Sequence, residues 1–211
     1  MSKNQIILLF FRRIPKIFSV ILHPLLMPTL GIYVILTSGT NASLLDSDAK
    51  NIILTLVLAC TFVIPIAFIP FYYYWRITTT LTMSERQERI IPLAITGTLY
   101  YVCFFILYQM GAPRIILAFL FATALTVIVN LLVTLKWKIS AHMTGIGGVI
   151  GLIFSMSFLY HVDTMFYLML AILLSGFIGF SRLSLNAHTP GEVYWGLING
   201  FAVMVTTFFV F

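Results

Sequence analysis

Long hydrophobic stretches alternate with short polar connections along the whole chain. A helix needs about 20 mostly apolar residues to cross a hydrocarbon core about 30 Å thick. Seven stretches approach this length, at about 18–38, 51–75, 91–110, 114–135, 143–160, 164–180 and 193–211. The pattern predicts an all-α, polytopic transmembrane helical bundle of six or seven spans, forming one domain over residues 1–211.

The segment ahead of the first span is basic as well as apolar. Residues 4–17 are too short and too charged to cross a membrane easily, so we expect a helix lying at the interface. No small-residue cleavage site follows, and the apolar run is long, which favours a retained anchor over a cleaved signal.

Successive spans place alternate connections on opposite sides of the membrane. Segments 76–90, 136–142 and 181–192 emerge on one face, and segments 37–50, 111–114 and 161–163 on the other. The first face receives nearly all reactive side chains: Arg76, Arg86, Arg89, Lys136, Lys138, His142, Arg182, His188 and Glu192. We therefore expect the chemistry of this protein at one membrane boundary.

Composition supports the membrane assignment and excludes other classes. Hydrophobic residues make up 61% of the chain and charged residues 9%, with a mean hydropathy of +1.06. A soluble domain is about 45–50% apolar and about 25% charged. The net charge of +6 comes from thinly spread cations that topology and lipid headgroups explain, so we expect no nucleic-acid binding. Cys60 and Cys103 lie in predicted spans and indicate neither a disulfide nor a metal site.

Two histidines stand at predicted helix starts on the reactive face. Ser140 is typical of an N-cap and would place His142 in the first helical turn. Thr189, Pro190 and Glu192 match a capping box with proline at the first helical position, so His188 lies just ahead of a helix. Unpaired N–H groups and the macrodipole favour anions at such positions.

Arginines near these histidines suit phosphate-ester chemistry. Arg182 precedes His188, and Arg86 and Arg89 are spaced to share a helix face. Arginines hold phosphate oxygens and neutralise charge that develops during transfer. A neutral histidine oriented by a carboxylate can attack phosphorus. A second histidine can protonate the departing oxygen and later deprotonate water.

The motif Ser181-Arg182, five residues, His188, three residues, Glu192 resembles the signature Ser-Arg-x5-His-x3-Asp of the type-2 phosphatidic acid phosphatase superfamily. The run 139–142, Ile-Ser-Ala-His, resembles its upstream signature Pro-Ser-Gly-His. The run 86–92 occupies the region of its first signature, Lys-x6-Arg-Pro. The resemblance covers about residues 80–200.

The resemblance implies a helical-bundle phosphatase that needs no metal or other cofactor. Its substrates would be lipid or polyprenyl phosphates, hydrolysed through a phosphohistidine intermediate. By this resemblance His188 is the nucleophile, Glu192 its orienting carboxylate and His142 the acid and base. Arg182 and Arg89 would clamp the phosphate, assisted by Ser140 and the backbone of its turn.

The chain departs from the family pattern at several positions. Glu192 replaces Asp and is one methylene longer, and Ile139 and Ala141 replace Pro and Gly. No Lys stands seven residues before Arg89. Arg86, from one turn away, or Lys138, from the second loop, could supply that cation.

Structural alternatives remain for several of these residues. The two site histidines could meet headgroups, the Arg86–Arg89 pair could snorkel, and Lys136 and Lys138 could be topology signals. Glu192 could be a capping-box partner, a role that one carboxylate would not easily combine with orienting a histidine. We expect His23 and His161 to be structural and away from the cluster, and GIGGVIG (145–151) to be a helix-packing surface.

These features predict a multi-pass phosphatase of the inner or plasma membrane that acts on a lipid-soluble phosphate. Undecaprenyl diphosphate, phosphatidylglycerophosphate and phosphatidate satisfy the pattern equally. Phosphotransfer to an alcohol or sugar, and binding of anionic lipid without turnover, are the alternatives. The spans lack ionisable residues at their centres, which disfavours a transporter. The family resemblance favours a periplasmic or extracellular active face, and the positive-inside rule favours a cytoplasmic one.

Overall fold

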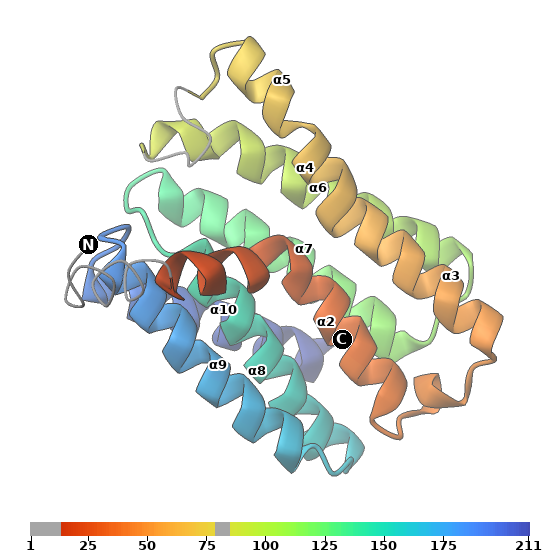
Figure 1. Cartoon of the computed structure of the whole chain (residues 1–211). Coiled ribbons are helices and arrows are strands. Elements are labelled where there is room, and N and C mark those ends of the chain that lie inside the picture. The colour runs from red at the N-terminus through yellow and green to blue at the C-terminus, as the bar shows by residue number, and fades with distance from the viewer. Residues whose placement is uncertain (1–13, 79–84) are drawn as a thin grey trace, which may run out of the picture.

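The computed structural model describes residues 14–78 and 85–211. Within these residues every regular element is helical, and seven helical segments are long and apolar enough to span a membrane. The predicted all-α bundle is confirmed, with seven candidate spans. Figure 1 shows the segments as long rods that run in broadly similar directions and are joined at two ends.

The first span, Ile14–Thr37, is broken in its first half. A helix over residues 14–21 ends ahead of His23, a 3₁₀ turn covers Pro24–Leu26, and α2 covers Met27–Thr37. His23 is extended, with φ −66° and ψ 137°, because a following proline disfavours helical backbone. Residues 14–17 of the predicted interfacial helix lie within this candidate span, and its residues 4–13 lie outside the described residues.

The second and third spans are also built from several pieces. A 3₁₀ turn, Asn41–Leu44, precedes the second span, which contains α3 (Ser47–Leu58), a π-helical turn (Ala59–Val63), α4 (Ile64–Ala67) and α5 (Ile69–Tyr74). Pro65 and Pro70 cannot donate backbone hydrogen bonds, which explains irregular turns at these points. A 3₁₀ turn, Gln87–Arg89, leads into α6 (Ile90–Gln109).

The last four spans are continuous: α7 (Arg114–Thr134), α8 (Ala141–Tyr160), α9 (Met165–Ser184) and α10 (Pro190–Val210). Helix α8 is central and contacts α2, α7, α9 and α10. Helix α9 runs beyond its predicted end at residue 180, so Arg182 lies on its last turn and not in a connecting loop.

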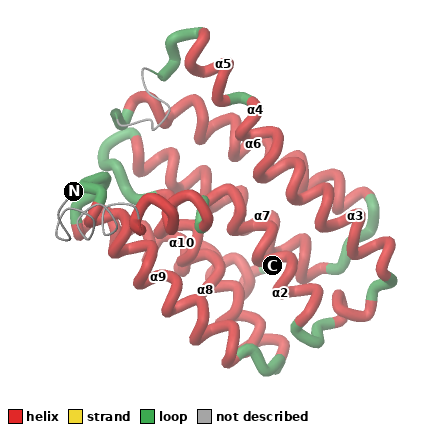
Figure 2. Tube along the Cα trace, in the orientation of Figure 1, coloured by secondary structure: helices red, strands yellow, loops and turns green. Residues whose placement is uncertain are grey.

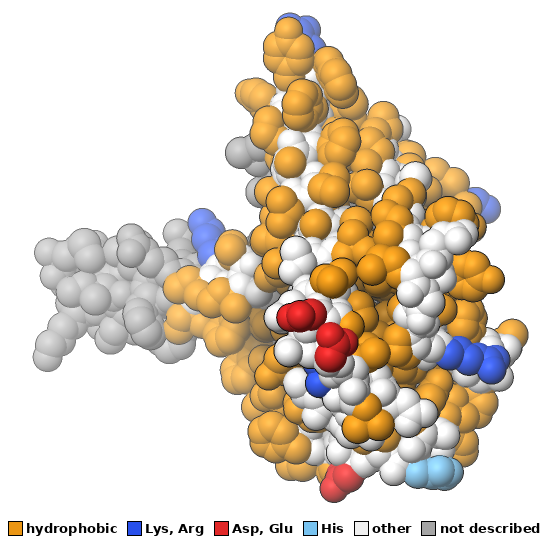
Figure 3. All heavy atoms as spheres, turned by 90° about the vertical axis from the view of Figure 1, so that its right-hand side faces the viewer, with side chains coloured by type: hydrophobic (Ala, Val, Ile, Leu, Met, Phe, Trp, Pro, Cys, Tyr) orange, Lys and Arg blue, Asp and Glu red, His pale blue; other side chains and the backbone are white. Residues whose placement is uncertain are grey.

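The connections gather at two opposite ends of the bundle. The end of α5, the start of α6, and the segments between α7 and α8 and between α9 and α10 lie at the left in Figure 1, and the other described connections lie at the right. Figure 2 shows the same division as loops at both ends of the helices. The end that lies at the right in Figure 1 shows few charged side chains, of both signs, among hydrophobic ones in Figure 3. The prediction that alternate connections lie at opposite ends of the bundle is confirmed.

Glycines bring α8 and α10 into close contact. A Cβ built on Gly200 would overlap the carbonyl oxygen of Thr144, and one on Gly147 would overlap that of Leu197. A Cβ on Gly196 would lie 2.7 Å from the carbonyl oxygen of Ser140. The predicted helix-packing role of the GIGGVIG run is confirmed, because small residues let two backbones approach closely. This contact sets the relative position of the two helix starts.

We expect Gly200→Ala to destabilise the protein, because α8 and α10 must separate to admit the methyl group. Overpacking of this kind costs about 1–3 kcal/mol. Gly176→Ala, on α9, is the matched control, since no heavy atom lies within 4 Å of its added Cβ. The thermal midpoint of the detergent-solubilised protein measures both. Equal midpoints for the two variants would contradict the close contact.

Candidate active site

The start of α8 is formed by a serine cap. Ser140 is the N-cap, and its Oγ accepts a hydrogen bond from the backbone N–H of Met143 at 3.5 Å. Its carbonyl oxygen accepts from both the backbone N–H and the hydroxyl of Thr144. His142 therefore lies in the first turn of α8, as predicted.

The start of α10 is a complete capping box. The Oγ1 of Thr189 accepts from Glu192 N at 3.4 Å, and Glu192 Oε2 accepts from Thr189 N at 3.1 Å. Pro190 is the first helical residue, where its missing N–H removes no intrahelical bond. The predicted capping box is confirmed. It fixes the carboxylate of Glu192 beside His188, the residue directly before Thr189.

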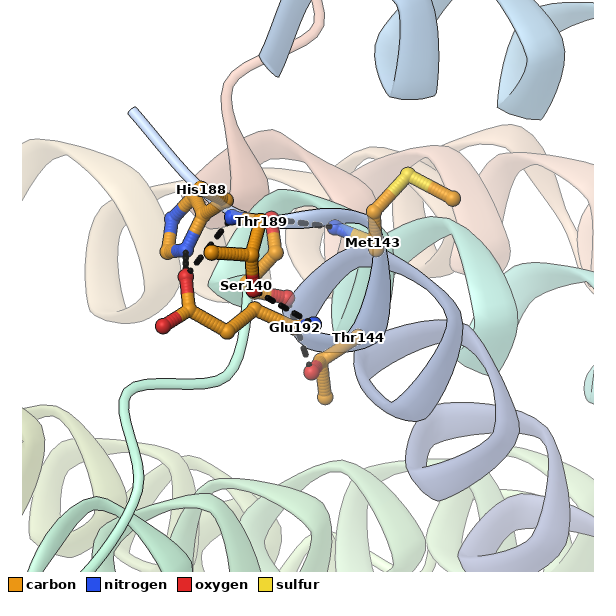
Figure 4. A network of polar contacts seen from close by, with 6 residues as sticks. All are labelled: Ser140, Met143, Thr144, His188, Thr189 and Glu192. Carbon is orange, nitrogen blue, oxygen red and sulfur yellow. Dashed lines mark hydrogen bonds and ion pairs between the residues drawn. The ribbon is translucent and has the colours of Figure 1, made fainter. Parts of the chain in front are cut away.

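The same carboxylate also orients His188. Nδ1 of His188 lies 2.9 Å from Glu192 Oε2, so one oxygen accepts from both the histidine ring and the Thr189 backbone (Figure 4). The expectation that one carboxylate would not easily combine the two roles is wrong. Glutamate reaches both donors because they are adjacent in the chain. With the proton on Nδ1, the lone pair of His188 lies on Nε2.

A backbone hydrogen bond joins the two helix starts directly. Ser140 N donates to the carbonyl oxygen of Glu192 at 3.0 Å. Figure 4 shows the cap of α8 next to the capping box of α10. Together with the glycine contact below them, this bond holds the two histidine-bearing turns side by side.

Two arginines complete the polar cluster. Arg182 reaches in from the last turn of α9, and its Nη1 donates to the hydroxyl of Ser19 at 2.7 Å. Arg89 ends the 3₁₀ turn ahead of α6. Both arginines are close enough to His188 to interact with it electrostatically. The cluster thus draws cations from two further spans.

All four of these basic side chains line one cavity. The cavity measures about 490 Å³ and is lined by Arg89, His142, Arg182 and His188 at its polar part. Deeper in the bundle its lining includes Tyr100, Phe119 and Met204. Its volume falls within the range of about 300–1,000 Å³ that is usual for ligand pockets. A cavity with a basic part and an apolar part fits an amphipathic ligand.

Four predicted site residues do not line the cavity, as far as the described residues show it: Arg86, Lys138, Ser140 and Glu192. Glu192 contacts the cavity only through His188. Arg86 instead donates from Nη1 to the carbonyl oxygen of Lys136 at 2.7 Å, which joins two loops of the same face. Ser140 is completely buried, and its hydroxyl is used by the helix cap. Lys138 is half-buried.

The structure adds two residues that the sequence interpretation missed. His23, expected to be away from the cluster, lines the cavity, and its ring centroid lies 5.6 Å from that of His142. Ser19 lines the cavity too, and its carbonyl oxygen lies 3.1 Å from His142 Nε2. The signal was the sequence His23-Pro24, because a proline inside a span interrupts the helix and can turn polar neighbours inward.

Burial lowers the pKa of His188 below its usual value of 6.5, and the positive charges of Arg89 and Arg182 add to this effect. The hydrogen bond from Nδ1 to Glu192 acts in the opposite direction. The histidine is therefore neutral at neutral pH, as a nucleophile must be.

We expect His188 to titrate well below pH 6.5, near the value of about 4 to which its pKa is lowered. In Glu192→Gln the midpoint should move further down, since the carboxylate that raises this pKa is removed. NMR titration of the histidine ring protons in detergent, with His188→Ala to assign the signal, measures both shifts. A titration midpoint of His188 at or above pH 6.5 would contradict the burial of the His188–Glu192 pair.

In comparisons with family models, curated proteins and solved structures, none matched this chain. We therefore infer its function from the geometry of the cavity and the spacing of its motifs.

Proposed function

We propose that this protein is an integral membrane phosphatase that hydrolyses a lipid or polyprenyl phosphate or diphosphate through a phosphohistidine intermediate. The observation that carries the proposal is that His188, held by Glu192 at 2.9 Å, lines one cavity together with His142, Arg89 and Arg182. An oriented neutral histidine, a second histidine and two cations are the groups that such a reaction requires.

In the first step His188 takes the phosphoryl group from the lipid. The lone pair of its Nε2 attacks phosphorus, and the bond from phosphorus to the lipid oxygen breaks. His142, which takes up a second proton when the negatively charged phosphate binds beside it, gives a proton to that oxygen and becomes neutral. Glu192 stays charged and holds the Nδ1 proton while the ring becomes positive. The guanidinium groups of Arg182 and Arg89 neutralise the equatorial oxygens.

In the second step water releases the phosphate. Neutral His142 takes a proton from a water molecule, whose oxygen attacks the phosphorus of the phosphohistidine. The bond between phosphorus and Nε2 breaks, and inorganic phosphate leaves. His188 returns to its neutral form with its proton still on Nδ1. The residues alone balance both steps, so we expect activity to survive a metal chelator.

The cavity and the membrane spans support a lipid substrate. The basic cluster lies at one end of the bundle, where the headgroup of a membrane lipid would lie, and the cavity continues among apolar residues. The resemblance to the phosphatidic acid phosphatase superfamily supports the same class. Its Ser-Arg-x5-His-x3-Asp spacing is met here with Glu192 in place of Asp, and the longer side chain reaches His188.

We expect purified protein to release inorganic phosphate from at least one of undecaprenyl diphosphate, phosphatidylglycerophosphate and phosphatidate. His188→Ala should lower kcat by roughly 10⁴-fold or more, because no other group accepts the phosphoryl. His142→Ala should lower it by about 10²–10⁴-fold.

His161→Ala is the control for these variants, since this histidine lies at the opposite end of the bundle. Phosphate release is measured by a colorimetric assay with and without EDTA. Inhibition by EDTA that a divalent cation reverses would contradict the mechanism. Appearance of phosphorylated alcohol in place of phosphate would identify a phosphotransferase, and binding of anionic lipid without any release an inert relative.

We place the active end on the periplasmic or extracellular side, on the basis of the family resemblance. Lys136→Cys reports on this end and Asp163→Cys on the other, and both side chains are exposed. In intact cells a membrane-impermeant thiol reagent should label the first variant and leave the second unlabelled. The parent protein is the blank, because Cys60 and Cys103 are buried. The reverse labelling pattern would place the active end in the cytoplasm.

A further inference from the structure

The hydroxyl of Ser19 lies between two groups that the proposed mechanism assigns to the phosphate. It accepts a hydrogen bond from Arg182 Nη1 at 2.7 Å, and it lies 3.4 Å from His142 Nε2. Ser19 also lines the cavity that contains His188. A hydroxyl at this place is within reach of any anion that the two histidines and the arginine hold together.

Ser19 occupies the role that the sequence pattern gave to Ser140. The Ser140 hydroxyl is completely buried and caps α8, and the side chain does not contribute to the cavity lining. The hydroxyl of Ser19 can accept from Arg182 and still donate its own proton, because a hydroxyl has one donor and two acceptor positions. The pocket therefore keeps a hydroxyl donor, supplied by a different span.

One buried donor of the pocket, Arg182 Nε, has no hydrogen-bond acceptor among the described residues. Buried N–H groups of this kind are nearly always paired in a functional state. A phosphate bound against the same guanidinium would supply the missing oxygen while it contacts the neighbouring Ser19 hydroxyl.

Contacts with α9 hold the segment that carries Ser19. The ring of Phe18 stacks on Phe177, with centroids 5.1 Å apart and planes inclined by 4°. Ser181 donates from its hydroxyl to the carbonyl oxygen of Pro15. The helix over residues 14–21 is thus attached to α9 at Pro15 and at Phe18, the residue directly before Ser19, so the Ser19 hydroxyl is a fixed part of the pocket wall.

The break in the first span explains how the segment reaches the pocket. Past Ser19 the helix ends at residue 21, and the lining of the cavity continues with His23, which is extended, and Pro24, which begins the 3₁₀ turn. Irregular backbone at membrane depth is tolerated where it is buried in protein or lines a cavity. His23 stabilises the turn by accepting from Leu25 N at 3.3 Å and packs its ring near His142.

We propose that Ser19 is a phosphate-binding residue: its hydroxyl donates to a phosphate oxygen that Arg182 holds at the same time, and the break at His23–Pro24 forms the wall that presents it. The inference rests on the proposed function for the identity of the anion. It assigns to the first span a direct contact with the substrate.

Inorganic phosphate is the probe, because it binds the site without turnover. We expect Ser19→Ala to weaken phosphate binding about tenfold, the equivalent of about 1.4 kcal/mol for one lost hydrogen bond to a charged group. Ser19→Thr keeps the hydroxyl and should bind within about twofold of the parent. The phosphate-dependent rise in thermal midpoint of the full-length protein in detergent gives the dissociation constants.

Two control variants separate binding from structure. Ser175→Ala makes the same change at a half-buried position of α9 that does not line the cavity, and it should leave phosphate binding unchanged. Phe18→Leu removes the ring that stacks on Phe177 while it leaves the hydroxyl in place, so it tests attachment of the segment. If Ser19→Ala binds like the parent, or if Ser19→Thr loses as much phosphate binding as Ser19→Ala, the proposal is overturned.

The proposed function can fail separately from this inference. His188→Ala should abolish phosphate release and still bind phosphate through Ser19 and Arg182. Phosphate binding that depends on Ser19 in a protein that hydrolyses no lipid phosphate would overturn the phosphatase and support the phosphate contact. Hydrolysis that depends on His188, with Ser19→Ala indistinguishable from Ser175→Ala in KM, would support the phosphatase and overturn the contact.

Discussion

The close approach of α8 and α10 is the constraint on which the rest of the site depends. Two helices can approach so closely only where glycine leaves room for backbone, as Gly147 and Gly200 do here. The bond from Ser140 N to the carbonyl oxygen of Glu192 then sets how their first turns face each other. His142 and His188 lie in or beside these turns, so their shared cavity is a consequence of backbone packing.

Glu192 shows how a short motif can place a reactive ring without a separate supporting loop. Its oxygen satisfies a backbone N–H that every helix start must pair and holds the ring of His188 as well. The cap is itself rigid, because the Thr189 hydroxyl closes it from the other side. The orientation of the histidine is therefore as well defined as the end of the helix.

The sequence predicts the membrane bundle and the local structure of both helix starts. Ser140, Thr189 and Glu192 could be assigned because capping depends on residues within one turn. The lining of the cavity could not be assigned in the same way. Arg86 and Arg89 are three residues apart, and only a tertiary contact decides that Arg86 joins the loop at Lys136 while Arg89 faces the cavity. Ser19 reaches Arg182 from 163 residues away, a distance that no local pattern describes.

The long sequence separation between Ser19 and Arg182 also sets an order of assembly. The ribosome makes the helix over residues 14–21 before its partners on α9, which follow only after four further spans. Until α9 enters the membrane, this helix lacks the contacts of Pro15, Phe18 and Ser19 with Ser181, Phe177 and Arg182. The basic pocket therefore closes late in synthesis, when nearly the whole chain has been inserted. A truncated chain that lacks α9 and α10 would retain the helix over residues 14–21 but not the contacts with α9 that hold it in place.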